Sequence, residues 1–291
     1  MQKSILITGE NGYIGKHIRQ WLLKKPDVYN VEMLNVRTDT WKNLCFKNID
    51  VMIHAAGIVH QPDITDWEIY KTINIDLSVA LAQKAKKEGV RQFVFLSTMA
   101  VYGKSKRLAV NVIDETTEIN PTGLYGQSKY LAEQEIQKLQ SDNFKIVIIR
   151  PPNVYGKNCK GGYISGFQSV LSKLPALPYA YPEIKQSTIY IDNLCELIRL
   201  IIESESSGFF MPQDGASVSA VELMTAIAES TALKRRKSRL LGIGVYLLSF
   251  LPIVKKAYGG VAYLEEMTAY FESQYVIVPF KEGIRRTLSN G

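Results

Sequence analysis

Short apolar runs alternate with longer amphipathic segments through the first half of the chain. The apolar runs predict strands at 5–8, 31–36, 51–55, 93–97 and 145–149, and the amphipathic segments predict helices at 14–23, 73–88 and 124–139. Strands that alternate with helices in this way are usually parallel and joined by crossover helices. We therefore expect an α/β fold with a doubly wound parallel sheet. Because the segment before residue 51 is short, a further strand there is abbreviated or missing.

The pattern changes after the strand at 145–149. The stretch 151–162 is rich in Pro and Gly and indicates the start of a smaller lobe. An apolar run at 188–193 and an amphipathic segment at 194–202 predict a strand and a helix that return to the main domain. We therefore expect two interleaved parts, a main domain of 1–155 with 186–203, and a smaller lobe of 156–185 and 204–291.

A glycine-rich turn follows the first predicted strand directly and leads into the first predicted helix. Gly9 permits the tight turn, Gly12 lets a pyrophosphate approach the backbone, and Gly15 lets the helix pack on the strand. The phosphates are expected at the helix N-terminus, where N–H groups and the helix dipole favour anions. The main domain is therefore predicted to bind a dinucleotide.

Tyr125 and Lys129 lie four residues apart on the predicted helix at 124–139 and share one face. The face continues through Ala132, Ile136 and Leu139, which would dock on the core. An ammonium one turn away favours the phenolate, so we expect a lowered pKa for Tyr125 and a general acid/base that works near neutral pH. Without the glycine turn, the same spacing would fit an ordinary amphipathic helix.

Together these motifs resemble the extended short-chain dehydrogenase/reductase family, in its sugar-nucleotide epimerase/dehydratase branch. Further matches are His54-Ala55-Ala56-Gly57 at a strand end, Asn74 in the next helix, the run from Phe93 to Gly103, and Arg150-Pro151-Pro152-Asn153-Val154-Tyr155-Gly156. The resemblance is clear for residues 1 to about 200. It implies a Rossmann-type fold, a smaller substrate-binding lobe and a bound NAD or NADP. The cofactor residues that it implies are Gly9, Asn11, Gly12, Tyr13, Ile14, Gly15, Asn35, Arg37, Ala55, Ala56, Gly57, Asn74, Tyr125, Lys129 and Pro151.

The resemblance also assigns the chemistry. Tyr125 exchanges a proton with the sugar oxygen, Thr98 hydrogen-bonds that oxygen, and Lys129 holds the nicotinamide ribose; Ser97 is a second candidate hydroxyl. Dehydratases of the family carry Asp and Glu where this chain has Met99 and Ala100, so 4,6-dehydration is disfavoured. Two activities remain at C4 of a nucleotide sugar, a UDP-sugar 4-epimerase and an NAD(P)H-dependent reductase of a 4-keto-6-deoxysugar. A dinucleotide sensor without enzyme activity is a third interpretation.

The second predicted strand lacks the acidic residue that usually selects NAD. Asn35 stands at its end, and Arg37 follows two residues later. A guanidinium there could clamp the 2′-phosphate of NADP, which gives a slight preference for NADP. In the alternative interpretation Arg37 is a solvated loop charge and Asp39 contacts the ribose of NAD.

For the substrate, Asn153 matches the family Asn that donates to the diphosphate. Gln186 stands where the family often has an Arg, and Lys185 could replace that charge without its bidentate geometry. His60 follows the strand that ends at Gly57 and is a candidate sugar contact, although a histidine in a loop is more often a surface residue.

Charge and cysteine content indicate the partners and the cellular compartment of the protein. The 291 residues carry a net charge of +7, which we assign to attraction of anionic nucleotides rather than nucleic acid, because no binding motif accompanies it. Three cysteines without metal or disulfide spacing, and a first segment that is a strand rather than a signal peptide, predict a cytoplasmic protein without a metal site.

The segment 240–254 has no charged residue and lies between two basic clusters. It is shorter than the roughly 20 residues that span a bilayer, and Pro252 interrupts it. We favour a helix of the smaller lobe packed against the sheet domain; contact with an anionic membrane surface is the alternative.

A homodimer is expected, because the helices that match 73–88 and 124–139 commonly pair across a two-fold axis in the family that the chain resembles; in the alternative, their apolar residues are all internal. The first carries Ile73, Leu77, Ala80 and Leu81, and the second carries Leu131 and Ile136 in different directions. Apolar residues on more than one side exceed what one sheet can cover, and two-fold pairing of these helices would bury the rest.

Overall fold

The structure is a computed structural model, and it describes residues 2–59, 65–103, 108–159, 163–231 and 235–289. The chain divides into two compact units. The first consists of Met1–Gly103, Glu118–Pro151 and Leu194–Pro212, and the second of Lys104–Thr117, Pro152–Asn193 and Gln213–Gly291. The chain passes between the units several times, so neither unit is a continuous segment.

The first unit is built on a six-stranded parallel sheet with the order β11-β6-β4-β3-β1-β2. The strands are β1 (Lys3–Thr8), β2 (Tyr29–Leu34), β3 (Val51–His54), β4 (Gln92–Leu96), β6 (Lys145–Ile149) and β11 (Gly208–Phe210). The central strands β3 and β4 are buried throughout, as expected for a parallel sheet that is covered on both faces.

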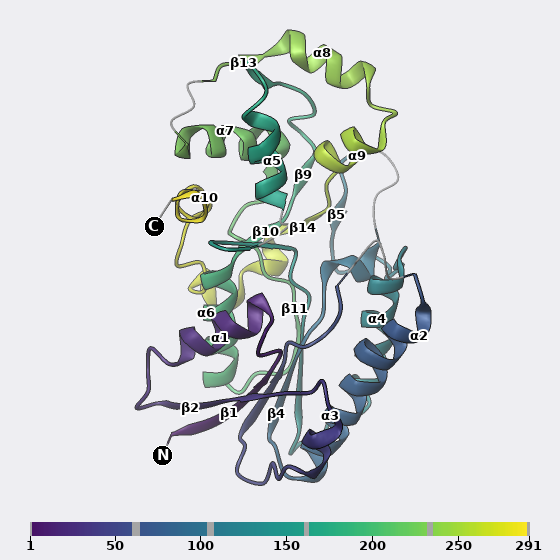
Figure 1. Cartoon of the computed structure of the whole chain (residues 1–291), viewed down its shortest axis with the longest axis vertical. Coiled ribbons are helices and arrows are strands. Elements are labelled where there is room, and N and C mark those ends of the chain that lie inside the picture. Colours follow the sequence, from purple (N-terminus) through teal and green to yellow (C-terminus); the bar gives the residue numbers. More distant parts are fainter. Residues whose placement is uncertain (1, 60–64, 104–107, 160–162, 232–234, 290–291) are drawn as a thin grey trace. The chain divides into compact units, whose positions relative to one another are not determined.

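Helices cover both faces of this sheet (Figure 1). Helices α1 (Tyr13–Leu22) and α6 (Ile191–Glu203) lie on one face, and α3 (Leu77–Lys87) and α4 (Leu124–Gln137) on the other. Shorter helical segments are η1 (Asp39–Asn43), α2 (Trp67–Tyr70), η2 (Lys71–Asp76) and η3 (Met99–Tyr102). The core under α3 and α4 includes Leu81, Phe93, Phe95, Ala132 and Ile136. The predicted doubly wound, Rossmann-type fold is confirmed.

Residues 35–50 contain the single-turn helix η1 and no strand. The expectation of an abbreviated or missing strand before Val51 therefore holds. Trp41 of η1 is buried in the core below α3, so this short turn covers the sheet where a longer crossover would otherwise lie.

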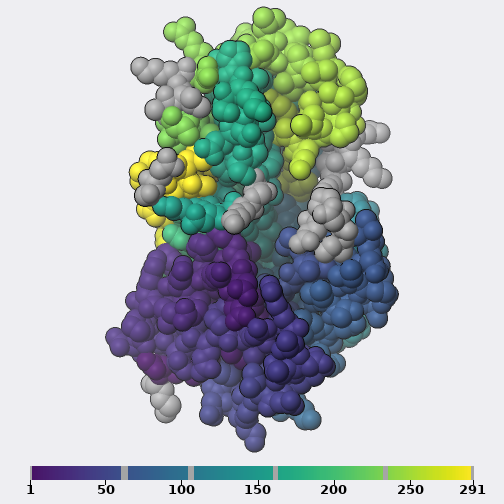
Figure 2. Space-filling model, viewed as in Figure 1, coloured from purple at the N-terminus to yellow at the C-terminus, as the bar shows by residue number. Residues whose placement is uncertain are grey.

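The second unit contains short paired strands and five helices within its described residues. Its strands are β5 (Val112–Ile113), β7 (Asn153–Tyr155), β8 (Leu177–Pro178), β9 (Lys185–Gln186), β10 (Thr188–Tyr190), β12 (Val218–Ser219), β13 (Lys237–Ser238) and β14 (Ala262–Tyr263). Its helices are α5 (Tyr163–Leu171), α7 (Ala220–Ser230), α8 (Arg239–Leu247), α9 (Pro252–Tyr258) and α10 (Phe280–Leu288), with single turns η4 (Glu265–Thr268) and η5 (Tyr270–Ser273). Figure 2 shows α8 and α9, in lime, on the outside of this unit.

The division into units differs from the predicted boundaries in four segments. Residues 152–155 and 186–193 were predicted in the main domain, but they belong to the second unit, where β10 pairs with β7 and does not join the main sheet. Residues 104–117 belong to the second unit, because β5 pairs with β14. Residues 204–212 belong to the first unit, because β11 adds a parallel strand beside β6. Strands β5 and β11 are too short to give a periodic pattern, which is why the sequence placed these two segments in the other part.

Candidate functional site

The turn between β1 and α1 has a conformation that glycine permits. Gly9 has φ +86°, and its carbonyl accepts a hydrogen bond from Gly12 N at 2.8 Å. A Cβ atom on Gly15 would lie 2.6 Å from Gly9 O, so a side chain there would push α1 away from the turn. Helix α1 begins at Tyr13, directly after the turn, with the positive end of its dipole toward it. An anion is therefore favoured at this turn.

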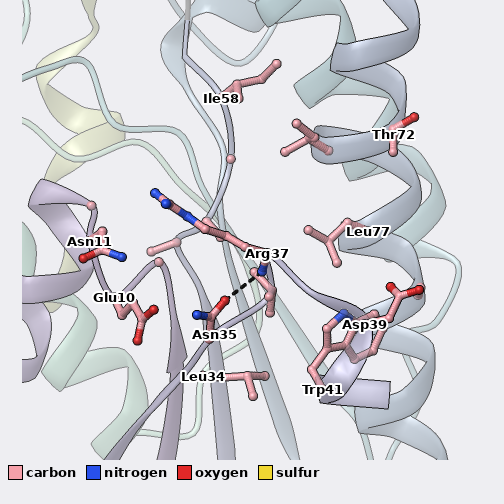
Figure 3. Close-up of a pocket in the computed structure, with 18 of the residues that line it drawn as sticks. Glu10, Asn11, Leu34, Asn35, Arg37, Asp39, Trp41, Ile58, Thr72 and Leu77 are labelled. Atoms are coloured by element: carbon pink, nitrogen blue, oxygen red, sulfur yellow. Dashed lines mark hydrogen bonds between the residues drawn. The ribbon is translucent and has the colours of Figure 1, made fainter. Parts of the chain in front are cut away.

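A cavity of about 710 Å³ opens beside this turn, within the first unit (Figure 3). This volume is in the range of small-molecule and cofactor sites. Its walls also come from the ends of β2 and β3 and from the helical segment 72–80. The predicted cofactor residues that line it are Gly9, Asn11, Gly12, Asn35, Arg37, Ala55, Ala56 and Gly57. Leu34, Trp41, Leu77 and Ala80 add apolar surface that suits the flat face of a purine ring. The residues present therefore fit a dinucleotide.

The end of β2 carries Asn35 where an Asp or Glu usually binds the ribose hydroxyls of NAD. Asn35 Oδ1 accepts from Arg37 N at 2.9 Å, so its side chain shapes the turn after the strand. The Arg37 side chain extends into the cavity between Asn11 and Ile58 (Figure 3). Asp39 also lines the cavity, but its carboxylate is paired with Lys42 Nζ at 2.9 Å. Arg37 is therefore the cation best placed to meet a phosphate at this end.

A buried polar network holds the loop after β3. Ser78 Oγ donates to Asn74 O at 2.7 Å and must therefore accept from His54 Nε2 at 2.9 Å. Thr8 Oγ1 lies 2.7 Å from His54 Nδ1 and accepts from Ala56 N at 3.1 Å. These hydrogen bonds assign a neutral His54 with its proton on Nε2. Burial and, less strongly, the charge of Lys129 lower the pKa of His54 to about 3, in agreement with that assignment.

Asn74 extends this network to the next part of the loop. It is fully buried; its amide accepts from Ile58 N and donates to Ile58 O and to Ser128 Oγ, each at 3.0 Å. It lies in η2, a π-helical turn, and such turns are frequent at functional sites. Asn74 thus fixes the loop that lines the cavity.

Lys129 is fixed at the carboxyl end of β4. Its Nζ donates to Leu96 O at 2.8 Å and lies 4.5 Å from the centroid of the Phe95 ring. A Cβ atom on Gly57 would lie 3.3 Å from Lys129 Nζ, so the ammonium sits against the cavity wall. Burial lowers the pKa of Lys129 to about 8, while Glu133 acts to raise it.

Tyr125 and Thr98 are brought together by the start of α4 and the end of β4. Burial raises the pKa of Tyr125 to about 12, while a hydrogen bond with the Thr98 side chain acts to lower it and Tyr70 to raise it. The prediction that Lys129 lowers the Tyr125 pKa is wrong. Desolvation of the phenolate outweighs the other effects, and the Lys129 ammonium is directed to Leu96 O.

Ser97 takes part in a second buried network. Its hydroxyl donates to the Glu133 carboxylate, and Arg150 forms a bidentate pair with that carboxylate, with Nη2 to Oε2 at 2.6 Å and Nε to Oε1 at 3.1 Å. Arg150 Nη1 also donates to Tyr102 Oη at 2.7 Å. Both ions are almost fully buried. Ser97 is therefore engaged with an ion pair, which favours a positioning role over proton transfer.

The remaining predicted cofactor residues lie in the first turn of α1 and shortly after β6. Ile14 and Tyr13 form the first turn of α1, and the Tyr13 ring packs on His17 with 4.3 Å between ring centroids. Pro151 O accepts from Met99 N at 2.9 Å and so joins the end of β6 to the segment that carries Thr98.

The predicted substrate residues lie in the second unit or outside the described residues. Asn153 Nδ2 donates to Gln186 Oε1 at 3.3 Å, so these two side chains form one polar group. Lys185 is exposed and neighbours the buried Gln186 on β9, and successive side chains of a strand point to opposite faces. Lys185 is therefore directed away from Asn153 and is a poor replacement for the missing Arg. His60 lies outside the described residues.

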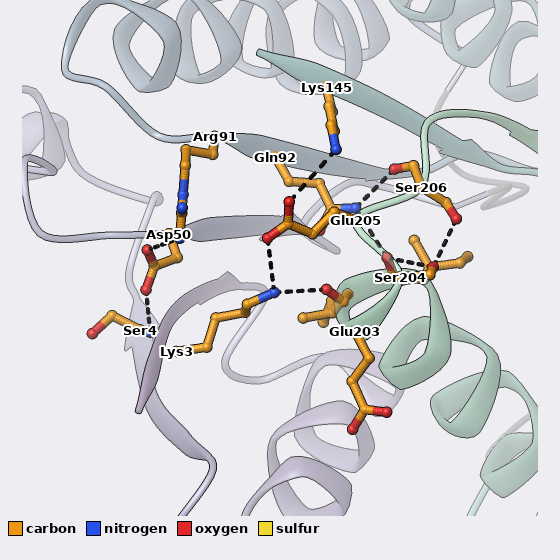
Figure 4. A network of polar contacts seen from close by, with 12 residues as sticks. Lys3, Ser4, Asp50, Arg91, Gln92, Lys145, Glu203, Ser204, Glu205 and Ser206 are labelled. Carbon is orange, nitrogen blue, oxygen red and sulfur yellow. Dashed lines mark hydrogen bonds and ion pairs between the residues drawn. The ribbon is translucent and has the colours of Figure 1, made fainter. Parts of the chain in front are cut away.

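Charged side chains also gather at the opposite, amino end of the sheet (Figure 4). Asp50 pairs with Arg91 at 2.6 Å, and Glu205 pairs with Lys3 at 3.3 Å and Lys145 at 3.6 Å. These groups are partly or largely exposed, which distinguishes them from the buried groups at the carboxyl end.

Sequence reasoning gave no role in the site to three of its contributors. The buried His54, the Glu133–Arg150 pair and the Trp41 wall each depend on residues that are distant in the sequence. One available signal was Glu133, which lies one turn after Lys129 on the face that the apolar residues predict to be buried.

A glycine turn at the head of a parallel sheet, with a Tyr–Lys pair and a Thr hydroxyl at the carboxyl end of its central strand, defines a protein of the short-chain dehydrogenase/reductase class. A family model described as the NAD dependent epimerase/dehydratase family matches residues 5–208, and the chain belongs to this family. The family predicted from the motifs is therefore confirmed.

Individual relatives agree with this assignment. A UDP-glucose 4-epimerase of Vibrio cholerae is 31% identical over 252 residues, which cover 78% of this chain and 76% of the relative. Two other curated relatives are matched over 66% and 56% of their own length.

Solved structures share the fold. The UDP-glucuronic acid 4-epimerase of Bacillus cereus, solved with NAD, has a TM-score of 0.74 at 19% identity, and the match covers 97% of this chain and 96% of that chain. RMD of Pseudomonas aeruginosa, solved with NADPH, has a TM-score of 0.72 at 18% identity and covers 98% of both chains.

Proposed function

We propose that the chain is an NAD(P)-dependent enzyme that acts at C4 of a nucleotide sugar, as a 4-epimerase of a UDP-linked sugar. The observation that carries the proposal is the pairing of Tyr125 with Thr98 while Lys129 lies against the wall of the dinucleotide-sized cavity. The names of the Vibrio cholerae relative and of the Bacillus cereus structure, both 4-epimerases, support the reaction.

The residues that would hold the dinucleotide are the turn Gly9–Gly15 at the diphosphate, Arg37 near the adenosine ribose and Lys129 at the nicotinamide ribose. When bound, the dinucleotide supplies the acceptor and donor of the hydride. Lys129 uses one of its three N–H groups on Leu96 O, which leaves donors for ribose hydroxyls.

Tyr125 moves the proton at the C4 oxygen, and Thr98 hydrogen-bonds the same oxygen. Because the pKa of Tyr125 is about 12, the phenol starts protonated at neutral pH. Removal of the substrate proton therefore needs a lower pKa in the loaded site, and the Thr98 hydrogen bond acts in that direction. Met99 and Ala100 carry no group that moves protons, so the proposal does not include dehydration.

The alternative is an NADPH-dependent reductase of a nucleotide 4-keto-6-deoxysugar. Arg37 favours this alternative, because its guanidinium in the cavity suits a 2′-phosphate, and RMD was solved with NADPH. Tyr125, Thr98 and Lys129 have the same roles in both reactions.

Two measurements separate these activities. The purified protein is denatured, and the released dinucleotide is identified by mass spectrometry. The native protein is then incubated with UDP-glucose and UDP-N-acetylglucosamine without added cofactor, and the C4 epimers are followed by NMR. Retained NAD and conversion of either sugar are expected for the epimerase. Oxidation of added NADPH by a 4-keto sugar, without epimerisation, would support the reductase. Dinucleotide binding with neither reaction would contradict both activities.

For the substrate, we propose that Asn153 donates to the diphosphate and that Gln186 orients its amide. Asn153→Ala should then raise KM for UDP-sugars with little change in kcat. Lys185→Ala is the matched control and should behave as the parent protein.

The homodimer and the cytoplasmic location stay predictions. Ile73, Leu77 and Ala80 line the cavity and Ile136 is buried, so the surface available for two-fold pairing is smaller than the sequence suggested. Leu131 and Ile69 remain exposed on this side. Sedimentation at micromolar concentration tests the dimer; a species near 32.8 kDa at every concentration would exclude it.

A further inference from the structure

Helices α8 and α9 expose a large amount of apolar side chain. Leu240 is 78% exposed, Leu247 72%, Ile253 71% and Phe250 67%, and Ile243, Tyr246 and Leu248 are also exposed. In Figure 2 the lime atoms of this segment form a continuous part of the surface of the second unit. The apolar side chains that we expected to be packed away are therefore at the surface. Exposed patches of this kind mark interaction sites.

The attachment of α8 explains why these side chains point outward. Gly242 is the one buried residue of the helix, and a Cβ atom on it would lie 2.1 Å from Tyr179 O. The backbone of α8 therefore packs directly against Tyr179, which follows β8. The Tyr246 hydroxyl also accepts a hydrogen bond from Tyr181 N at 3.1 Å. Leu240, Ile243 and Leu247 share another stripe of the helix, at spacings of three and four residues, and that stripe is exposed.

The segment that carries this apolar surface has cations and no carboxylates. The sequence from 230 to 264 contains no Asp or Glu. Its exposed cations lie at the two ends of the segment and are Arg236, Lys237, Arg239, Lys255 and Lys256. None of these forms an ion pair with a carboxylate among the described residues.

We propose that residues 236–256 bind the interface of an anionic phospholipid bilayer, with the exposed apolar side chains inserted among the lipids and the flanking cations at the phosphates. Among the described residues no helix is long and apolar enough to cross a membrane, so the segment lies along the surface. An apolar face with basic flanks is the composition that this mode of binding requires.

Charge favours the bilayer over a second copy of the chain. A two-fold dimer on this surface would place the cations of both copies around one interface, without acidic residues in the segment to balance them. An anionic bilayer supplies both an apolar interior and negative charge. The proposal is independent of the activity at C4, since it uses none of the residues of that site.

Flotation of the full chain with lipid vesicles tests the proposal. We expect binding to phosphatidylcholine vesicles that contain about one third phosphatidylglycerol, weaker binding to phosphatidylcholine alone, and weaker binding as salt is added. Leu247→Ser with Phe250→Ser should lower the partition constant about tenfold or more by removing inserted apolar groups. Lys255→Glu with Lys256→Glu should abolish the preference for anionic lipid.

Matched controls are Leu44→Ser, at another exposed leucine, and Lys86→Glu with Lys87→Glu, at two exposed lysines of α3. Both should bind vesicles as the parent protein does, and melting curves and dinucleotide binding should be unchanged in all variants. The proposal is overturned if the parent protein does not float with anionic vesicles, or if the serine variant floats equally well. It is also overturned if sedimentation shows a dimer that the serine variant dissociates, because the patch would then bind a second copy.

Discussion

The amino and carboxyl ends of the parallel sheet use charged residues differently. At the amino end, Asp50 and Glu205 form exposed pairs with Arg91, Lys3 and Lys145. At the carboxyl end, His54 and Lys129 are buried and Tyr125 is partly buried, and burial is the main cause of the pKa shifts of all three.

This difference indicates at which end of the sheet substitutions should have the larger effect. Exposed ion pairs are weakened by water and salt and contribute little to stability. A buried group has few alternative partners, so its protonation state and hydrogen bonds are fixed by the fold. Substitutions at the carboxyl end should therefore have the larger effects, and the following predictions test this in order of expected size.

The largest effect is expected for Tyr125→Phe. It removes the proton-transfer group and leaves the packing of the ring, so turnover should fall by about 100- to 10,000-fold. Dinucleotide binding and the melting temperature should change little. Steady-state rates on a sugar nucleotide that the parent protein converts provide the measurement; a near-parental rate would contradict the mechanism.

Glu133→Gln tests the buried ion pair. Arg150 would then remain as a buried cation without its carboxylate partner, and the free energy of unfolding should fall by about 3–5 kcal/mol. The matched change at the amino end is Arg91→Ala, which breaks the exposed pair with Asp50 and should cost about 1 kcal/mol or less. Urea unfolding of both variants measures the contrast, and equal losses would show that burial does not separate the two ends.

Arg37→Ala tests the cation that extends into the cavity. If Arg37 contacts a 2′-phosphate, the affinity for NADP(H) should fall by about 1.5–3 kcal/mol, the size of a hydrogen bond to a charged group. NAD(H) should bind nearly as before. Calorimetric titration with both dinucleotides gives the answer, with Lys42→Ala as a control at the same cavity. Equal affinities of the parent protein for NAD and NADP would leave Arg37 without a role in selection.

His54 predicts a pH effect on stability. Its pKa is about 3 in the folded state and about 6.5 when unfolded, so between these values the unfolded chain binds the extra proton. Stability is therefore lost as the pH falls below about 6.5, by about 2 kcal/mol between pH 7 and pH 5 from this residue alone. Urea unfolding at the two pH values measures the loss. His54→Gln should reduce this slope, although it lowers stability at pH 7, and an unchanged slope would count against the assignment.

Local patterns predicted much of this molecule, because its main elements are long and its key motifs are contiguous. The predicted strand at 145–149 is β6, and the predicted helix at 124–139 is α4 within two residues. The glycine turn joins two consecutive elements, and the Tyr125–Lys129 pair lies within one helix. The fold class and the family followed from these features.

What could not be predicted depends on distant contacts and on burial. Strand β5 was missed because it has two residues, Val112 and Ile113, and its partner β14 comes much later in the chain. The direction of the Tyr125 pKa was wrong because desolvation is a property of the packed site. The exposure of Leu240 and Leu247 was missed because an apolar run resembles a buried helix, whether or not a neighbour covers it.

The short connection between β2 and β3 has a consequence for self-association of strands. Within the described residues β2 pairs only with β1, so one side of Tyr29–Leu34 keeps backbone groups without a sheet partner. Such an edge can recruit a strand from another chain, most readily while the protein is folding. The strand is short, and Glu32 places an exposed carboxylate at its centre. A second copy that docked there would bring its own Glu32 close to the first. Repulsion between the two carboxylates would oppose this pairing and so reduce aggregation.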